Sequence, residues 1–475
     1  MARFYIENYG CRATQADGAA LERQFLERGL ERAAAARDAE IVVLNTCTVT
    51  AGADKDARAS IRRLQRTNPD CRILVTGCYA QRAPDEVAAL PGVTWVVGNS
   101  HKHRAAEIAT APSTGFVPVA QLSGDLPFPA QRESVRRPSL FVEDIFAHTE
   151  LLAAPVFEAA HERTRPNLKV QDGCDNRCSF CVIPYVRGRS RSLPAERVIA
   201  EVRTLVDAGY REVVISGINL GRWGRDLEVA ARQPRVAGER AKPSSERQTT
   251  AGHRLESLIR AILEQTSLEK LRVSSVEPMD WSDDLIALMA ESARIAKHAH
   301  VPMQSGSDAV LRRMHRKYRP WHYREKVMKI RKAMPTAAIG ADVMVGFPGE
   351  TEAEFDETRR MVEELPFTYL HVFTYSARPG TAAAALPGQV PVALTRERNR
   401  ALRDIASHKK AAFMRSLAGT AVEAITLQSG NSEFTEALTT NYLKMRLAGR
   451  LEGNRWIDAR IEGVTGEMLT GNRVV

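Results

Sequence analysis

Three cysteines in the middle of the chain have a spacing suited to metal chemistry. Cys174, Cys178 and Cys181 stand as Cys-x3-Cys-x2-Cys in QDGCDNRCSFCVIPYVRG. Three thiolates are one short of closing a tetrahedral zinc site or of capping every iron of a cubane cluster. A cubane held by three cysteines keeps one iron open, and an open iron can bind a substrate. The spacing therefore favours a catalytic iron–sulfur cluster over a structural metal site.

A second trio lies in the N-terminal third. Cys11, Cys47 and Cys78 each follow a short β-rich run, in NYGC, LNTC and VTGC. If those runs are parallel strands, their carboxyl ends meet at one sheet edge, where open α/β folds bind ligands. The sequence therefore suggests a second cluster with a vacant position. The alternative is three buried apolar thiols. Cys71 precedes its strand, so we interpret it as a core or surface thiol.

The elements expected around these residues define an α/β protein of several domains. Residues 1–110 alternate strand runs at 4–7, 41–45, 72–76 and 93–97 with amphipathic helical stretches, which predicts a parallel-sheet α/β domain. Residues 111–160 are Pro-punctuated and read as a linker with limited structure. Each expected strand positions the loop that follows it.

Residues 161–410 contain a second βα series. Six strands are expected at 167–171, 212–216, 271–275, 298–303, 338–345 and 369–375, each followed by a polar, glycine-rich loop. This predicts a partial (β/α)6 barrel whose loops form the C-terminal face, where barrel chemistry takes place. Residues 226–252 are expected to be an inserted, flexible surface loop. Residues 411–475 give five short strands, at 422–427, 435–440, 442–447, 455–464 and 468–474, and predict a small oligonucleotide-binding-like barrel.

Composition limits the classes of function. The 475 residues are 44% apolar, with a formal net charge of +10 and a pI near 9.3. No run of about 18 apolar residues occurs, so no membrane span is expected. Seven clustered cysteines indicate reduced thiols in a cytoplasm. The basic balance favours a polyanionic partner such as nucleic acid, although it does not establish one.

These pieces resemble a known family. NTCTVT, VTGCYAQ, GCDNRCSFCVIPYVRG, SGINLG, SSVEP, QSGSDAVLRRM, DVMVGFPGET and FTYSARPGT are similar to the radical S-adenosylmethionine (SAM) methylthiotransferases, over essentially the whole chain. The resemblance implies an N-terminal methylthiotransferase domain, a radical-SAM barrel and a C-terminal TRAM barrel. SGINLG, the tyrosine of TGCYAQ and HVFTYSARPGT are most like the tRNA branch that acts on N6-threonylcarbamoyladenosine. The isopentenyladenosine and ribosomal-protein branches are the near alternatives. Thr14, where the family usually has asparagine, and the 226–252 insertion depart from the pattern.

The resemblance also implies cofactors and partners. Cys174, Cys178 and Cys181 would hold the [4Fe–4S] cluster that cleaves SAM to a radical, which removes hydrogen from adenine carbon 2. Cys11, Cys47 and Cys78 would hold a second [4Fe–4S] cluster that carries the sulfur. A reduced flavodoxin or ferredoxin-type protein would supply the electrons. The protein itself would be a monomer that binds tRNA as its substrate. Another class stays open, a non-enzymatic RNA-binding protein whose cysteines hold zinc or a sensing cluster.

The same resemblance implies the SAM contacts, and the residues themselves offer further candidates. SAM contacts are expected from residues that follow the barrel strands, namely Phe180, Gly217, Glu277, Gln304 and Ser305. Phosphate contacts are expected from four arginines, namely Arg187, Arg189, Arg191 and Arg378. Ordinary core packing, buried hydrogen bonding or a solvated face is the alternative for each. His101, His103, His298 and His300 are expected to have structural roles, since the cysteines already account for the metals.

Overall fold

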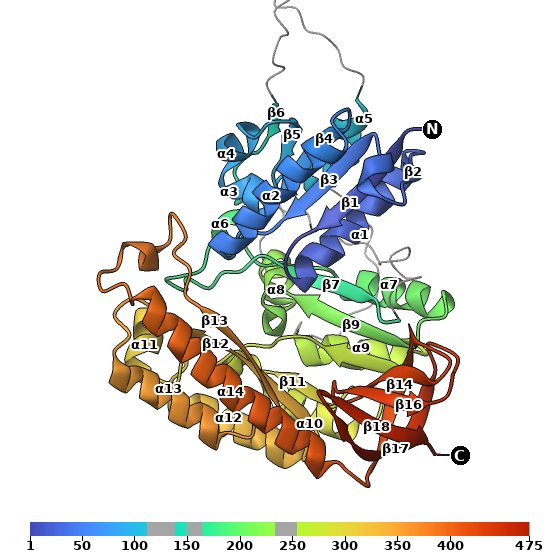
Figure 1. Ribbon diagram of the computed structural model, residues 1–475, viewed down its shortest axis with the longest axis vertical. Helices are drawn as coiled ribbons and strands as arrows, with labels where there is room; N and C mark the ends of the chain where they lie inside the picture. The colour runs from blue at the N-terminus through green and yellow to red at the C-terminus, as the bar shows by residue number, and fades with distance from the viewer. Residues whose placement is uncertain (112–137, 149–150, 152–163, 233–253, 475) are drawn as a thin grey trace, which may run out of the picture. The chain divides into compact units, whose positions relative to one another are not determined.

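The computed structural model describes residues 1–111, 138–148, 151, 164–232 and 254–474. The chain divides into two compact units. The smaller unit comprises Met1–His148 together with Tyr185–Arg187, and the larger comprises Thr149–Pro184 with Gly188–Val475. Figure 1 shows the elements of both units.

The smaller unit is built on a six-stranded parallel sheet of order β2-β1-β3-β4-β5-β6. Apolar clusters cover both of its faces, and every residue of β3 is buried between them. A parallel sheet buried on both faces is the expected setting for such an apolar strand. The strands are β1 (Arg3–Asn8), β2 (Glu31–Arg32), β3 (Ile41–Thr46), β4 (Arg72–Gly77), β5 (Val93–Val97) and β6 (Ser139–Phe141). The helices are α1 (Arg12–Glu27), α2 (Ala51–Thr67), α3 (Cys78–Arg82), α4 (Pro84–Ala88) and α5 (Ala105–Thr110).

The predicted parallel-sheet domain is confirmed, with one difference at its end. Strand β6 lies within the stretch expected to be a connector, yet it pairs in parallel with β5 from Trp95↔Ser139 to Val97↔Phe141. Gly98 N–H also donates to the Phe141 carbonyl over 2.9 Å. A three-residue strand that only completes a sheet edge has too little periodicity to be recognised from sequence. Most of the remaining connector lies outside the described residues.

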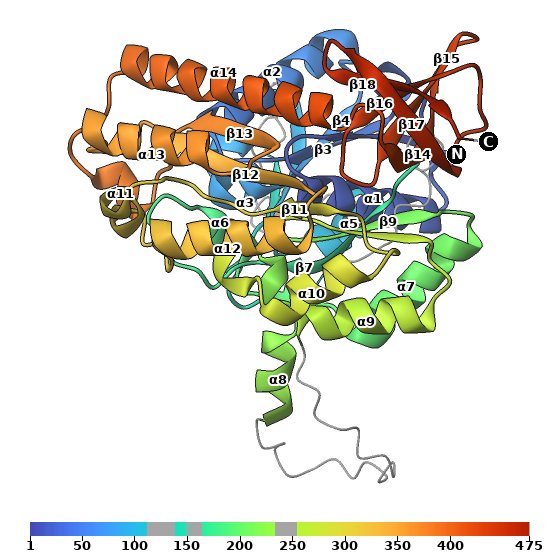
Figure 2. The same ribbon diagram turned by 90° about the horizontal axis from the view of Figure 1, so that it is seen from below.

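The larger unit contains the predicted barrel of six parallel strands. Strands β7, β9 and β10 form one sheet, β11, β12 and β13 form another, and the bridge Ser275↔His300 connects them. Figure 2 shows helices along the outside of these strands. The strands are β7 (Asn167–Asp172), β9 (Glu212–Gly217), β10 (Lys270–Val273), β11 (His298–His300), β12 (Ala338–Val345) and β13 (Tyr369–Thr374). The helices are α6 (Ile183–Arg187), whose residues Tyr185–Arg187 belong to the smaller unit, α7 (Ala195–Asp207), α8 (Arg225–Arg232), α9 (Leu255–Gln265), α10 (Asp283–Glu291), α11 (Asp308–Arg313), α12 (Pro320–Ala333), α13 (Glu352–Glu364) and α14 (Val392–Ser416).

Two local features of this unit differ from expectation. A short antiparallel strand, β8 (Arg191–Ser192), pairs with β7. Residues 226–232, predicted as the start of a flexible loop, belong to helix α8 instead. The Asp226 carboxylate accepts hydrogen bonds from the Ser192 N–H and hydroxyl at 2.8 and 2.6 Å, which fixes the start of the helix to the barrel. The rest of the predicted insertion, from 233 to 252, lies outside the described residues.

A closed five-stranded barrel ends the chain, as predicted. Its order is β14-β15-β16-β18-β17, and its interior is filled by buried residues such as Met445, Ile461 and Leu469. The strands are β14 (Ala421–Gly430), β15 (Phe434–Thr439), β16 (Lys444–Ala448), β17 (Trp456–Thr465) and β18 (Met468–Arg473). Tyr442, expected to start β16, has φ 66° and lies in the preceding turn.

The C-terminal barrel is attached to the larger one through a buried arginine. Arg272 of β10 is fully buried and donates to the Thr440 and Thr439 carbonyls at 3.1 and 3.4 Å. The same guanidinium donates to the buried Glu212 carboxylate at 2.6 Å and lies over the Tyr442 ring. A buried arginine that lost its partners would lower the stability of the fold strongly. These contacts therefore hold the two barrels together.

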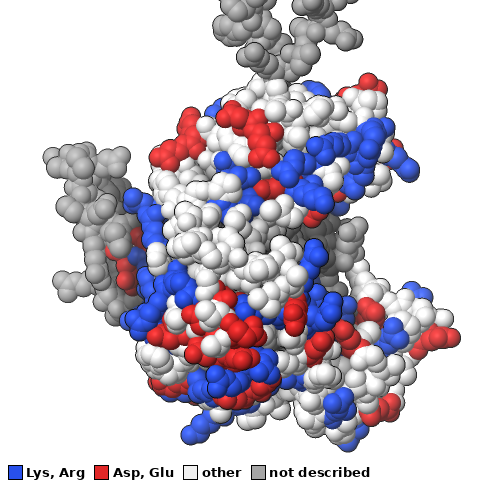
Figure 3. Space-filling model, turned by 60° about the vertical axis from the view of Figure 1, so that its left-hand side comes forward, with Lys and Arg blue, Asp and Glu red and all other residues white. Residues whose placement is uncertain are grey.

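Two surface properties bear on the expected partners. Within the described ranges, no helix is long and apolar enough to cross a membrane. Figure 3 shows basic and acidic side chains interspersed over one face of the molecule. The positive charge of the chain is therefore not gathered into a single basic surface on that face.

Candidate cluster-binding sites

The structure brings the N-terminal cysteine trio to one edge of the smaller unit's sheet. Cys11 is the N-cap of α1, Cys47 directly follows β3, and Cys78 is the first residue of α3. Strands β1, β3 and β4 are neighbours in the sheet, and Thr46 pairs with Gly77, so Cys47 and Cys78 leave the sheet side by side. Gly10, which directly precedes Cys11, lies against the Cys47 side chain, so Cys11 reaches the same edge.

Two glycines allow this close approach. Gly10 has φ +113°, and a Cβ there would lie 2.6 Å from Cβ of Cys47. Gly77 has φ +99°, and its Cβ would lie 2.3 Å from the Thr46 carbonyl oxygen. Both the backbone conformation and the lack of space exclude other residues. Gly10 and Gly77 therefore set the spacing of the cysteines that follow them.

The chemistry of this site suits a metal cluster. Burial, followed by the charge of Cys78, raises the pKa of Cys47 to about 11. The thiol is thus protonated at neutral pH unless a cation replaces its proton, so metal binding there releases protons. Asn99 Nδ2 donates to Cys78 Sγ at 3.6 Å, and Thr14 Oγ1 lies 3.7 Å from Cys11 Sγ. Hydrogen bonds to cysteine sulfurs tune iron–sulfur clusters, and Thr14, which was expected to depart from the family pattern, is one of the polar residues beside these sulfurs.

A buried group of charges lies close to this trio. Asp17 Oδ2 accepts from Lys102 Nζ at 2.9 Å and from Arg187 Nη2 at 3.0 Å, and Lys102 also donates to Asn45. The three charged residues are 1–3% exposed. The charge of Arg187 lowers the pKa of Cys47 and so opposes the effect of burial on that thiol. Arg187, predicted to contact phosphate, is instead buried in this ion pair, which argues against that role.

Replacing Asp17 with asparagine is expected to destabilise the smaller unit by about 3 kcal/mol, because the buried Lys102 and Arg187 would lose the carboxylate that they share. Burial already lowers the pKa of Lys102, and Asp17 opposes that shift. Urea unfolding of the full chain, followed by circular dichroism, measures the change. Glu107→Gln, which removes an exposed ion pair with Arg104, is the matched control and should unfold like wild type. Equal midpoints for Asp17→Asn and Glu107→Gln would contradict the assignment.

The second trio lies in the loop that follows β7. Gly173 has φ +70°, and a Cβ there would lie 1.9 Å from the Arg189 carbonyl oxygen, so the loop begins with a turn that requires glycine. Cys174 N–H donates to the Gly188 carbonyl, and Cys181 N–H to that of Cys178, both over 3.1 Å. Burial raises the pKa of Cys181 to about 12. The Cys181 thiol therefore stays protonated at neutral pH unless a cation replaces its proton.

Side chains that the sequence analysis did not select direct hydrogen bonds at these sulfurs. Arg316 Nη1 donates to Cys178 Sγ at 3.3 Å, and its other nitrogen pairs with the Glu277 carboxylate. Asn219 Nδ2 donates to Cys174 Sγ at 3.7 Å. Asn219 lies in the SGINLG motif and Arg316 in LRRMHRKYR, but neither motif indicates which cysteine its residue contacts. Glu277, predicted to face SAM, is half-buried and holds Arg316 against Cys178.

A buried glutamine organises the loop. Gln171 accepts from the Asn219 N–H at 2.7 Å and donates to the carbonyls of Asp172 and Gly173. A Cβ at Gly217 would lie 2.8 Å from Gln171 Oε1. The lack of a side chain at Gly217 therefore makes space for Gln171, and its predicted close approach to SAM stays a prediction.

The other predicted SAM residues occupy mixed environments. Ser305 is buried, and its hydroxyl lies 3.1 Å from that of Thr358 and accepts from the Ser307 N–H. Phe180 packs partly buried against the main core. Gln304 has φ 63°, and its Oε1 is buried without a hydrogen-bond partner among the described residues. Of these three, Gln304 alone combines a strained backbone with an unsatisfied polar atom, as expected at a ligand site.

The predicted phosphate contacts differ in exposure. Arg378 is 3% exposed and so cannot reach a phosphate in this conformation. Arg189 is exposed and Arg191 is half-buried.

The larger unit also contains a cavity of about 1050 Å³ that is lined by β13, α14 and the C-terminal barrel. This cavity offers further cationic side chains. Its basic residues, which the sequence analysis did not select, are Arg165, Arg403, Lys410, Lys444 and Arg446.

Comparison with known proteins decides the family. A family model described as "Uncharacterized protein family UPF0004" matches residues 3–98, and the radical SAM superfamily model matches residues 168–362. Threonylcarbamoyladenosine tRNA methylthiotransferase MtaB of Bacillus subtilis is 36% identical over 94% of this chain and 91% of its own. The chain belongs to the radical SAM methylthiotransferases.

Other methylthiotransferases and a solved structure are also similar to it. MtaB of Aquifex aeolicus is 33% identical over 94% of this chain and 97% of its own. The tRNA-2-methylthio-N(6)-dimethylallyladenosine synthase of Thermobifida fusca is 31% identical over 98% of this chain and 86% of its own. The structure of the radical SAM methyltransferase TsrM from Kitasatospora setae, with cobalamin and a [4Fe–4S] cluster bound, shares the fold with a TM-score of 0.51 at 16% identity, covering 81% of this chain and 77% of that one.

Proposed function

We propose that this radical SAM methylthiotransferase inserts a methylthio group at carbon 2 of N6-threonylcarbamoyladenosine, next to the anticodon of tRNA. The observation that carries the proposal is similarity over nearly the full length to relatives that are named for that substrate. Four of them, from Bacillus subtilis, Aquifex aeolicus, Rickettsia prowazekii and Chlamydia pneumoniae, are 31–36% identical over 94–99% of this chain.

The geometry supports two cluster sites with different tasks. In this proposal Cys174, Cys178 and Cys181 hold the [4Fe–4S] cluster to which SAM binds, and Cys11, Cys47 and Cys78 hold a second [4Fe–4S] cluster. When bound, the clusters and SAM supply the radical and the sulfur chemistry. The protein's part is positional: Arg316 and Asn219 orient sulfurs, and Gln171 holds the loop rigid. Gln304 is the residue we assign to contact SAM.

The basic cavity supports a tRNA substrate. Five cationic side chains and only two acidic ones, Asp404 and Glu467, line it. Lys and Arg side chains that neutralise phosphates supply most of the affinity for nucleic acid, and that affinity falls with salt. We further propose a cytoplasmic monomer that receives electrons from reduced flavodoxin or a ferredoxin-type protein. The reduced, clustered cysteines support that compartment.

Mass spectrometry of tRNA nucleosides tests the substrate. Cells that lack this protein are expected to lose the methylthio form of N6-threonylcarbamoyladenosine completely, while the unmodified nucleoside accumulates, and a plasmid copy should restore the product. Loss of the methylthio isopentenyl nucleoside instead would select the branch of the Thermobifida relative. An unchanged nucleoside profile would contradict both tRNA branches and favour a ribosomal-protein substrate.

Anoxic reconstitution tests the non-enzymatic alternative. The proposal expects two clusters per chain and 5′-deoxyadenosine formed from SAM under reduction. Zinc in both cysteine sites, without SAM cleavage, would support an RNA-binding protein. Each trio supplies three thiolates, whereas structural zinc sites normally use four protein ligands, which favours the enzyme.

A further inference from the structure

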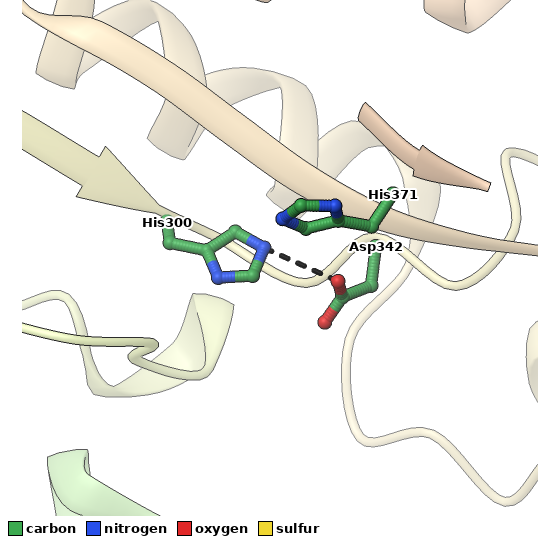
Figure 4. Close-up of side chains that lie close together, drawn as sticks. All are labelled: His300, Asp342 and His371. Atoms are coloured by element: carbon green, nitrogen blue, oxygen red, sulfur yellow. Dashed lines mark ion pairs between the residues drawn. The ribbon is translucent and has the colours of Figure 1, made fainter. Parts of the chain in front are cut away.

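Neighbouring strands of the barrel direct two histidines and an aspartate toward one another. His300 ends β11, Asp342 lies in β12 and His371 lies in β13. Strand β12 lies between the other two, and Asp342 pairs directly with His371. One ligand atom from each residue lies within 4.8 Å of the others. Figure 4 shows the three side chains converging.

The trio lies on the strand face that is turned away from the main core. Side chains alternate along a strand. The neighbours of His300 and Asp342 in sequence are fully or almost fully buried residues of the main core, Ala299, Val301, Ala341 and Val343. The histidines and the aspartate therefore point to the opposite side of the strands from these neighbouring core residues. His371 is exposed and lines the basic cavity of about 1050 Å³, so an ion can reach the trio.

The closest contact of the trio has the spacing of two metal ligands. His300 Nε2 lies 3.3 Å from Asp342 Oδ1. That buried nitrogen nevertheless has no hydrogen-bond partner in the described part of the chain, because the two groups are not aligned for one. Two ligands bound about 2.1 Å from a tetrahedral zinc ion lie about 3.3–3.4 Å apart. The two atoms converge as ligands do, rather than as a hydrogen-bonded pair.

The neighbouring histidine behaves differently. His298 Nε2 lies 2.7 Å from the Tyr369 hydroxyl, and its ring packs on the rings of Tyr369 and Tyr442. These contacts fit the structural role expected for His298 from the sequence. His300 is the member of the pair whose nitrogen is directed at a carboxylate and a second imidazole, so the two histidines have separate tasks.

We propose that His300, Asp342 and His371 bind one divalent transition-metal ion, distinct from the cysteine-bound clusters. Two imidazoles and one carboxylate are a donor set that takes zinc or iron(II). Three protein ligands leave at least one coordination position open, and the exposure of His371 directs that position toward the cavity. His300 thus has a metal-binding role in this proposal, in place of the structural role expected from the sequence.

Zinc binding to the full chain tests this site. The chain is first loaded anoxically with iron and sulfide so that the cysteines are occupied, then dialysed against zinc, and both metals are measured by elemental analysis. Wild type is expected to bind one zinc that His371→Ala and Asp342→Asn bind at least about tenfold more weakly. His322→Ala, which removes an exposed histidine elsewhere, is the matched control and should bind like wild type.

Iron content serves as the folding control, and it should be the same in all four proteins. Asp342→Asn keeps the size of the side chain, so it separates loss of a ligand from loss of packing. Equal zinc affinity in wild type and both ligand variants would overturn the proposal, as would a wild type that binds no zinc. The measurement uses neither tRNA nor SAM, so its result is independent of the proposed substrate.

Discussion

Replacing Cys178 with alanine is expected to lower reductive cleavage of SAM by more than about 100-fold and to abolish methylthiolation with it. Loss of residues that only support metal ligands typically costs 10- to 100-fold, and Cys178 is itself a proposed ligand. The same change leaves Arg316 without its sulfur partner. Production of 5′-deoxyadenosine by the reconstituted enzyme, measured by liquid chromatography, gives the effect directly.

Cys71→Ala is the matched control for this experiment. Cys71 is buried, whereas Cys178 is half-buried, and Cys71 precedes β4, so it lies at the opposite edge of the sheet from Cys78. The variant should cleave SAM and modify tRNA at wild-type rates. Normal cleavage by Cys178→Ala, or equal losses in both variants, would contradict the assignment of the central trio.

Replacing Cys47 with alanine is expected to separate the two activities. Cleavage of SAM should stay within about twofold of wild type, whereas formation of the methylthio nucleoside should fall by more than about 100-fold. The physical reason is that Cys47 belongs to the smaller unit's trio, while the residues that orient Cys174 and Cys178 belong to the larger unit. Paired assays of 5′-deoxyadenosine and of the modified nucleoside measure the ratio.

Iron analysis of the Cys47 variant provides a second readout. The reconstituted variant should hold about half of the wild-type iron, because a cubane with only two thiolate ligands from the protein is not retained. Equal loss of cleavage and transfer would refute the division of tasks between the trios. Full iron content in the variant would show that the N-terminal cysteines hold no cluster.

The sequence predicted the elements and the cysteine positions well, since both follow from local patterns. Each of Cys11, Cys47 and Cys78 follows an apolar strand, and parallel strands end at a common edge whatever the rest of the chain does. The partial barrel and the closed C-terminal barrel followed from strand periodicity in the same way. These features depend on neighbours only a few residues away.

The partners of individual side chains could not be predicted in this way. Arg187 lies in a run of arginines typical of an exposed basic loop, and its burial depends on Asp17, 170 residues earlier. Arg316 meets Cys178 across 138 residues. Whether an arginine is solvated, paired or directed at sulfur is decided by tertiary contacts that no local pattern encodes. Strand β6 and helix α8 were missed because each is fixed by pairing with a distant element.

The buried attachment of Arg272 to the Thr439 and Thr440 carbonyls has an evolutionary consequence. A terminal module joined only by a tether can be gained, lost or exchanged between genes without changing its host. This one is different, because its loss would take away the two carbonyls that accept hydrogen bonds from a fully buried arginine. We therefore expect the C-terminal barrel and the part of the larger barrel that contacts it to change together in evolution. A chimera that exchanges one without the other would lose complementary contacts between the two barrels.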